Sequence, residues 1–251
     1  MRLALLLLCS IVSFSVAGAT NDVAIRTYKG PSKSVGNGRA YAWVQIDSTR
    51  NPVAIGVTLT RRALSGLSQH AMKSWNLTLP KHAVPFNHVG LDWNPHGHEP
   101  DHIYDKPHFD FHFYFITKGK RRHISCTGAD LTRCEKAPPM DYQPSDYVQT
   151  PGGIPMMGAH WIDPFADEFN GGTFEKTFIW GSYDGRLAFM EPMVTREYFL
   201  TQPDFMVYIK DAAKVDRSGY YPTHYAVRYD PTAQTYSVSL VDLRYRAASL
   251  E

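Results

Sequence analysis

The sequence predicts a mostly β fold, an antiparallel β-barrel or sandwich with a few short helices and long loops. Short segments of alternating polar and apolar residues recur along the chain, and Asp, Asn, Gly and Pro lie between them. Helical periodicity is confined to brief stretches. Aromatic residues make up 13% of the 251 residues and there are 17 prolines, which is typical of an ordered, loop-rich protein.

The individual strands are expected after residue 38. Residues 39–47 and 53–59 flank turn residues and predict a hairpin, and so do residues 174–182 with 186–191 and residues 221–229 with 235–243. Three further segments predict single strands, the second of them a brief strand or elbow: residues 107–117, 158–163 and 204–209. Short helices are expected at residues 61–67 and 196–200, and long loops at residues 87–105 and 135–157.

The N-terminus has the pattern of a secretory signal peptide. Arg2 precedes the apolar run Leu3–Val16, which is too short to span a bilayer comfortably, and Ala17-Gly18-Ala19 forms an A-x-A cleavage site. No other apolar run is long enough to cross a membrane. We therefore expect a periplasmic or secreted protein with a signal peptide at 1–19, a flexible lead-in at 20–38 and a single β-rich domain at 39–249.

Charge and cysteine content narrow the function classes. Without the signal peptide the chain is nearly neutral and has no basic block with interleaved aromatics, so nucleic acid is not an expected partner. Cys126 and Cys134 then remain, and an oxidising compartment favours a disulfide between them over a pair of metal thiolates. Asn76-Leu77-Thr78 matches a glycosylation site, which has meaning only in a eukaryotic secretory host.

The most informative stretch is residues 96–114, HGHEPDHIYDKPHFDFHFY, which holds five of the eleven histidines. Its second half alternates as a strand does, with His108, Asp110 and His112 on one face and Phe109, Phe111 and Phe113 on the other. Two imidazoles and a carboxylate directed into the same space indicate a metal site or a proton-transfer site.

Strand geometry limits which of these residues can share one ion. Residues four apart on a strand face are ~13 Å apart, so His108 and His112 cannot both bind one metal from a regular strand without a bulge or long side-chain reach. More distant residues are therefore expected to contribute. The expected metal ligands are His98, His108, His112 and His160, with Glu99 or Asp110 as a further ligand, an orienting residue or a catalytic base, and with Glu191 as an additional carboxylate.

Mixed nitrogen and oxygen ligands suit zinc, which we rank first, and also iron, manganese or copper. A His-rich site with an open position could activate water for hydrolysis, and two histidines with one carboxylate could bind oxygen, so a hydrolase and an oxygenase both stay open. His98-Glu99-Pro100-Asp101-His102 matches the H-E-x-x-H motif of zinc peptidases. Pro100 lies inside it and no helical periodicity surrounds it, so we reject that interpretation.

Interpretations without a metal also remain. An internal polar network without a metal could hold His108, Asp110 and His112. For His160, a metal ligand and a structural histidine are equally supported. Salt bridges could account for Glu99 and Glu191. Two other function classes are a β-barrel protein that binds a small apolar or aromatic molecule, and a homo-oligomeric envelope protein with residues 135–157 at an interface. The sequence has no nucleophile elbow, P-loop or dinucleotide-binding glycine pattern.

Four segments also carry a resemblance to a family: DWNPHGHEP at 92–100, PHFDFHFY at 107–114, GAHW at 158–161 and FMEPM at 189–193. Together they resemble a family of exported bacterial proteins known only as a domain of unknown function, and the resemblance extends from about Gly38 to Leu200. It implies export, a bacterial source and a single domain. It implies no activity, and a bacterial source argues against glycosylation of Asn76.

Overall fold

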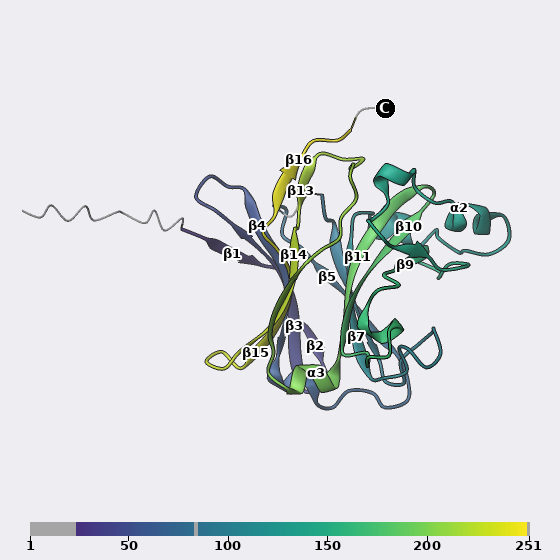
Figure 1. The fold of residues 1–251 in the computed structure, drawn as a ribbon. Helices are drawn as coiled ribbons and strands as arrows, with labels where there is room; N and C mark the ends of the chain where they lie inside the picture. The colour runs from purple at the N-terminus through teal and green to yellow at the C-terminus, as the bar shows by residue number, and fades with distance from the viewer. Residues whose placement is uncertain (1–23, 83–84, 250–251) are drawn as a thin grey trace, which may run out of the picture.

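The computed structural model describes residues 24–82 and 85–249. The expected signal peptide, residues 1–19, lies outside the described residues. Within the described part, the strands form two seven-stranded antiparallel sheets and one two-stranded sheet. Each large sheet is open at both edges, and the two sheets face each other as a sandwich (Figure 1). The predicted mostly β class is thus confirmed, and of the two architectures the sandwich fits.

The first sheet has the strand order β1-β3-β4-β15-β14-β12, with β2 paired to β3. The two hairpins predicted in this part of the chain are present, β3 with β4 and β14 with β15. The strands are β1 (Arg26–Lys29), β2 (Lys33–Val35), β3 (Gly38–Ile46), β4 (Pro52–Thr60), β12 (Asp204–Tyr208), β14 (His224–Asp230) and β15 (Thr235–Val241).

The segment expected to be a lead-in contains two of these strands, β1 and β2. Their side chains are mostly exposed, and both strands pair with β3 through the backbone. Every residue except proline has both a backbone donor and a backbone acceptor, whatever its side chain. These short edge strands therefore leave no apolar alternation in the sequence.

The second sheet has the strand order β5-β6-β7-β11-β10-β9-β8. Its strands are β5 (Lys73–Thr78), β6 (His88–Asn94), β7 (His108–Tyr114), β8 (Val148–Gln149), β9 (Ala159–Ile162), β10 (Lys176–Tyr183) and β11 (Arg186–Thr195). The predicted hairpin of β10 with β11 is present. The small sheet pairs β13 (Gly219–Tyr221) with β16 (Arg244–Arg246).

Strand β6 contradicts the prediction of a loop at residues 87–105. All seven of its residues are buried, and β6 pairs with β7 along its whole length and with β5 from His88 to Trp93. The apolar positions of HVGLDWN face the core, whereas its His, Asp and Asn lie on the other face of the sheet. Those polar residues give β6 the composition of a loop, and the burial of this second face could not be read from its own sequence.

The described helices are all short. They are α1 (Lys118–Arg121), α2 (Leu131–Glu135) and α3 (Arg196–Leu200), with 3-10 turns η1 (Arg61–Leu64), η2 (Gly128–Asp130), η3 (Met140–Tyr142) and η4 (Asp167–Phe169). Helix α3 confirms the prediction at 196–200, and η1 is shorter than the predicted helix. None of the described helices has the length and apolar character that crossing a membrane requires. The predicted disulfide joins Cys126 to Cys134.

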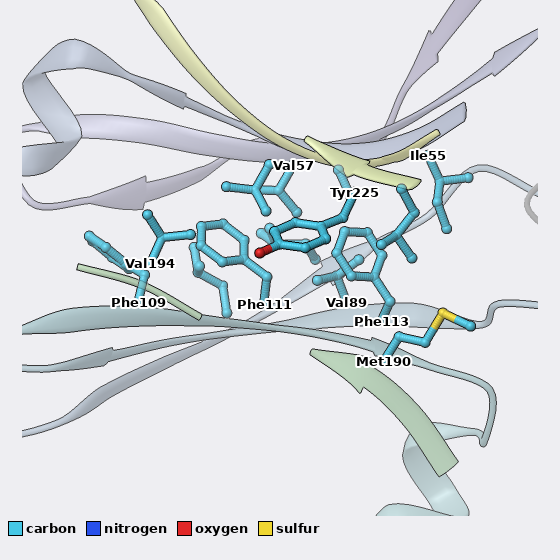
Figure 2. Close-up of a cluster of buried hydrophobic side chains, with 14 of the residues drawn as sticks. Ile55, Val57, Val89, Phe109, Phe111, Phe113, Met190, Val194 and Tyr225 are labelled. Carbon is cyan, nitrogen blue, oxygen red and sulfur yellow. The ribbon is translucent and has the colours of Figure 1, made fainter. Parts of the chain in front are cut away.

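The main core lies between the two large sheets. Ile55, Val57 and Tyr225 of the first sheet face Val89, Phe111 and Phe113 of the second (Figure 2). The three phenylalanines of β7 are fully buried there. The side chains of His108, Asp110 and His112 therefore lie on the outer face of the second sheet, and they are also buried, because loops cover that face.

Candidate metal centre

A cavity of about 540 Å³ lies on the outer face of the second sheet. Its floor is formed by polar residues of β6, β7 and β11, including Asp92, Asp110 and Glu191. The loop that contains His98 and the loop of residues 150–157 close over it. A concave site with converging polar groups under apolar walls is the usual form of a small-molecule site.

His98, His108 and Asp110 form the first of two candidate metal-binding groups. His108 Nε2 lies 3.0 Å from Asp110 Oδ1, and His98 Nε2 lies 3.5 Å from Asp110 Oδ2. One potential ligand atom of each residue lies within 4.8 Å of the others. We call these three residues the first group.

Backbone carbonyls determine which nitrogen of each histidine faces the carboxylate. His108 Nδ1 lies 2.6 Å from the carbonyl oxygen of Lys106, and His98 Nδ1 lies 2.8 Å from that of Glu99. A carbonyl only accepts, so both Nδ1 atoms donate, and in the neutral rings both Nε2 atoms carry lone pairs. Metal-bound histidines are commonly oriented by this kind of hydrogen bond.

Glycine at position 97 allows the loop to bring His98 over the sheet. Gly97 has a φ of +74°, and a Cβ there would overlap the carbonyl oxygen of Tyr104. The same carbonyl accepts a hydrogen bond from the backbone N–H of His98. A side chain at position 97 would therefore push the loop away from Asp110.

The environment of Asp110 fits a bound cation. Its Oδ2 accepts a hydrogen bond of 2.6 Å from Asn94 Nδ2, while its buried Oδ1 makes no hydrogen bond within the described residues. Burial raises the pKa of Asp110, but the neighbouring His108 and His98 outweigh burial and hold that pKa well below its usual range. A carboxylate oxygen 3.0 Å from an imidazole lone pair requires a shared cation, either a proton on His108 or a metal ion.

His112, His160 and Glu191 form the second group. His112 Nε2 lies 3.1 Å from Glu191 Oε1, and His160 Nε2 lies 3.8 Å from Glu191 Oε2. The other nitrogen of His112, Nδ1, lies 3.3 Å from Asp92 Oδ2. Neither nitrogen of His112 is aligned for a hydrogen bond, and Asp92 Oδ2 and Glu191 Oε2 also have no hydrogen bond within the described residues.

Burial controls the charges of the second group. It raises the pKa of Glu191 well above its ordinary value, and the nearby Asp110 and Asp92 raise it further. Burial also lowers the pKa of His160 to about 3, and the neighbouring His112 adds to this shift. His160 is therefore neutral at pH 7, and one of its nitrogens carries a lone pair.

The four histidines expected to be metal ligands lie over the outer face of the second sheet, but in two groups, and three of them, His98, His112 and His160, line the cavity. His98 and His108 belong to the first group, and His112 and His160 to the second. This division agrees with the limit that strand spacing places on His108 and His112. Glu99 is exposed, lines the same cavity, and contributes its backbone carbonyl to the orientation of His98.

Asp92, Asn94 and Arg121 are among the cavity residues that were not anticipated from the sequence. Asp92 and Asn94 lie on β6, opposite Asp110 and His108 of β7. The alternation of HVGLDWN, with every second residue polar or glycine, is the signal that could have identified them. Arg121 had no such signal, because it lies in the basic sequence KGKRR.

Part of the chain is similar to a known protein family. A family model described as TTHB210-like, hypothetical protein TTHB210, matches residues 47–93. No curated protein and no solved structure matches the chain. The matched segment includes β4, β5 and most of β6, and it contains none of the six residues of the two groups. The comparison therefore suggests similarity to an uncharacterised family and provides no activity.

Proposed function

We propose that the protein binds a divalent transition metal ion through His98, His108 and Asp110 and acts as a metal-dependent hydrolase on a small molecule in the cavity. The observation that carries this proposal is the orientation of the two histidines. Both Nδ1 atoms donate to backbone carbonyls, so both Nε2 atoms face the buried carboxylate of Asp110, whose Oδ1 makes no hydrogen bond within the described residues. Zinc is our first choice, with iron, manganese and copper as alternatives.

Three protein ligands leave open coordination positions. A catalytic zinc with three ligands binds water in the remaining position and lowers the pKa of that water to about 7. In this assignment Asp110 is a ligand and Asn94 fixes its second oxygen. Glu99, at the exposed edge of the same cavity, is our candidate for a catalytic base. Two histidines and one carboxylate also suit iron and oxygen chemistry, so an oxygenase is the related alternative.

We also propose that the protein is exported to the periplasm or secreted. The Cys126–Cys134 disulfide is compatible with an oxidising compartment. Detection of the protein in a periplasmic fraction, with a mature N-terminus at residue 20, is the expected result. A cytoplasmic protein that starts at Met1 would contradict it.

The metal proposal is tested on protein purified without a His tag. We expect about one equivalent of metal per chain by elemental analysis, a lower unfolding temperature after chelation, and loss of metal in His98→Ala and His108→Ala. His102→Ala is the matched control, because its side chain lies in the same loop and is 95% exposed. Metal-free protein that takes up no added zinc or iron, and whose stability chelator leaves unchanged, would refute the proposal.

A binding protein without catalysis is the second candidate function. The observation that favours it is the apolar wall of the cavity, which includes Met72, Ile154 and Met157. Native mass spectrometry would then show a co-purified ligand, and metal-loaded protein would hydrolyse none of a panel of small esters. The exposed Met140 and Val148 in residues 135–157 keep a homo-oligomer as a further proposal, which light scattering would test.

A further inference from the structure

Arg121 is a buried cation in the wall of the same cavity. Its side chain belongs to α1 and is 7% exposed. Among the described residues no carboxylate lies within ion-pair distance, 4.0 Å, of its guanidinium. A buried charge without a countercharge is unfavourable unless something anionic reaches it.

Neutral partners hold the guanidinium in place. Its Nε donates to the carbonyl oxygen of Met156 at 3.0 Å, and its Nη1 donates to Asn76 Oδ1 at 3.2 Å. Nη1 also lies 3.3 Å from His88 Nε2. Burial, and next the charge of Arg121, lower the pKa of His88 to about 3, so His88 is neutral and accepts this bond. Nη2 makes no hydrogen bond within the described residues, and it is the nitrogen left for a ligand.

The sheet is shaped to receive this side chain. The guanidinium carbon lies 4.0 Å from the centre of the Tyr114 ring, which places the cation over the ring. Beside that ring is Gly90, where a Cβ would lie 3.1 Å from Tyr114 Cε2 and 3.4 Å from Arg121 Nη1. Any larger residue would crowd the guanidinium. Arg121 is therefore fixed before a ligand arrives, which reduces the entropy lost on binding.

We infer that the cavity binds a small organic carboxylate, with its carboxylate on Arg121 and its apolar body against Met72, Ile154 and Met156. These three apolar side chains line the cavity and are exposed to solvent, Met72 by 58%, Ile154 by 43% and Met156 by 42%. Asn76 accepts from Arg121 through Oδ1, so its amide nitrogen is a second donor beside Nη2. Two donors match the two oxygens of one carboxylate, whereas a phosphate group has three acceptor oxygens to bond.

This inference rests on the proposed function in one respect. Asp92, Asp110 and Glu191 line the same cavity, and a bound metal ion would offset their negative charge. Within the described residues none of these carboxylates lies within 4.0 Å of the Arg121 guanidinium, whose three partners are the neutral groups of Met156, Asn76 and His88. The carboxylate end of the ligand would therefore bind beside these neutral groups.

Calorimetric titration of the full-length, zinc-supplemented protein tests the inference. The probes are benzoate, its neutral counterpart benzamide, and phenyl phosphate. We expect benzoate to bind about tenfold or more tightly than benzamide, because a hydrogen bond between two charged groups is stronger than one between a charged and a neutral group. Equal affinities for benzoate and benzamide would overturn the inference, and so would tighter binding of phenyl phosphate.

Two single-residue variants test whether Arg121 is the arginine that binds the carboxylate. Arg121→Gln should lose the preference for benzoate, while Arg122→Gln should keep it, because Arg122 is the neighbouring, exposed arginine. A folded Arg121→Gln protein that still prefers benzoate would overturn the inference. If Arg121→Gln does not fold, the comparison of benzoate with benzamide on the wild type still decides.

Zinc binding is measured on the same protein samples, so that the metal proposal and the carboxylate inference can each be refuted independently. Zinc binding without a preference for benzoate refutes only the carboxylate inference. Preference for benzoate through Arg121 without zinc binding refutes only the metal centre.

Discussion

The two His/carboxylate groups lie on the same face of one sheet, yet their imidazoles are held differently. In the first group each histidine has one nitrogen bonded to a backbone carbonyl and the other directed at Asp110. In the second group His112 has a carboxylate near each nitrogen, Asp92 and Glu191, and is aligned for a hydrogen bond with neither. A backbone carbonyl fixes one tautomer of a neutral histidine, whereas His112 has no hydrogen bond within the described residues that would fix its tautomer. The first arrangement therefore suits a metal ligand better than the second.

The groups also differ in access. The His98 side chain is 38% exposed and comes from a loop, whereas His112 and Glu191 are 1% and 2% exposed and come from adjacent strands. An ion can therefore reach the first group directly from the cavity opening. We expect the first group to bind metal more tightly and to exchange it faster.

The largest expected difference is between two isosteric substitutions, Asp110→Asn and Glu191→Gln. Asp110→Asn removes the charged ligand of the first group, and we expect zinc affinity to fall by more than about a hundredfold, since even outer partners of metal ligands cost 10–100-fold. Glu191→Gln should change the affinity of the tightest site much less. Competition with a zinc chelator measures both, and the opposite ranking would reverse our assignment of the two groups.

A smaller effect is expected from Asn94→Ala. This change removes the amide that donates to Asp110 Oδ2, so the carboxylate can rotate away from the histidines, and zinc affinity should fall by about tenfold to a hundredfold. Asn87→Ala is the matched control, because Asn87 bonds His88 and touches neither group. Equal zinc affinities of the two variants would show that Asn94 does not orient the ligand.

The loop of the first group can be tested with two glycines of nearly equal backbone conformation. Gly97 and Gly152 have φ of +74° and +75°, but a Cβ meets the Tyr104 carbonyl only at position 97 and has no neighbour within 4 Å at position 152. Both alanine variants carry similar backbone strain, about 1 kcal/mol. Gly97→Ala should in addition displace His98 and weaken zinc binding by about tenfold, with His112 and His160 unaffected. Similar zinc affinities in both variants would contradict this role of the loop.

Asp130 lies outside both groups and serves as a comparison for Asp110, because both of its carboxylate oxygens accept hydrogen bonds. Its Oδ1 accepts from the Tyr183 hydroxyl, and its Oδ2 accepts from the N–H groups of Ser125 and Cys126. These bonds, that of Tyr183 first, lower the pKa of Asp130 to about 2. Because the unfolded value is higher, about 3.9, their contribution to stability is complete above that pH and is lost as pH falls toward 2.

The pH dependence of stability measures this contribution. Asp130→Asn should reduce the free energy of unfolding at pH 7 by less than about 2 kcal/mol, and by a smaller amount at pH 2. Denaturant titration at the two pH values checks this. A loss of equal size at both would mean that the carboxylate charge of Asp130 contributes nothing.

Much of the candidate site could be predicted from the sequence, because polar and apolar residues alternate regularly along β7. The pattern of His108, Asp110 and His112 against three phenylalanines predicted a strand with one polar face. The strand spacing also predicted that His108 and His112 could not share one ion. From the sequence we predicted one metal centre with four histidines. The sequence could not divide them into two groups, because it does not show that His160 lies beside Glu191.

The rest of the candidate site could not be predicted, because it depends on contacts between segments that lie far apart in the sequence. Strand β6 was predicted as a loop because its outward residues are polar, and their burial comes from loops elsewhere in the chain. Asn94 and Asp92 were therefore missed. Arg121 was missed because a basic run usually indicates a solvated surface, and only the tertiary structure shows it over Tyr114.

The position of β7 in the second sheet has a consequence for hydrogen exchange. β7 is bonded to β6 and β11 on its two edges and is buried on both faces. Its amide hydrogens should be among the slowest in the protein to exchange, in the class that requires global unfolding. Of the first group, only the segment that carries His98 then has to lose conformational freedom when an ion binds. The entropy lost on metal binding would be small for that reason.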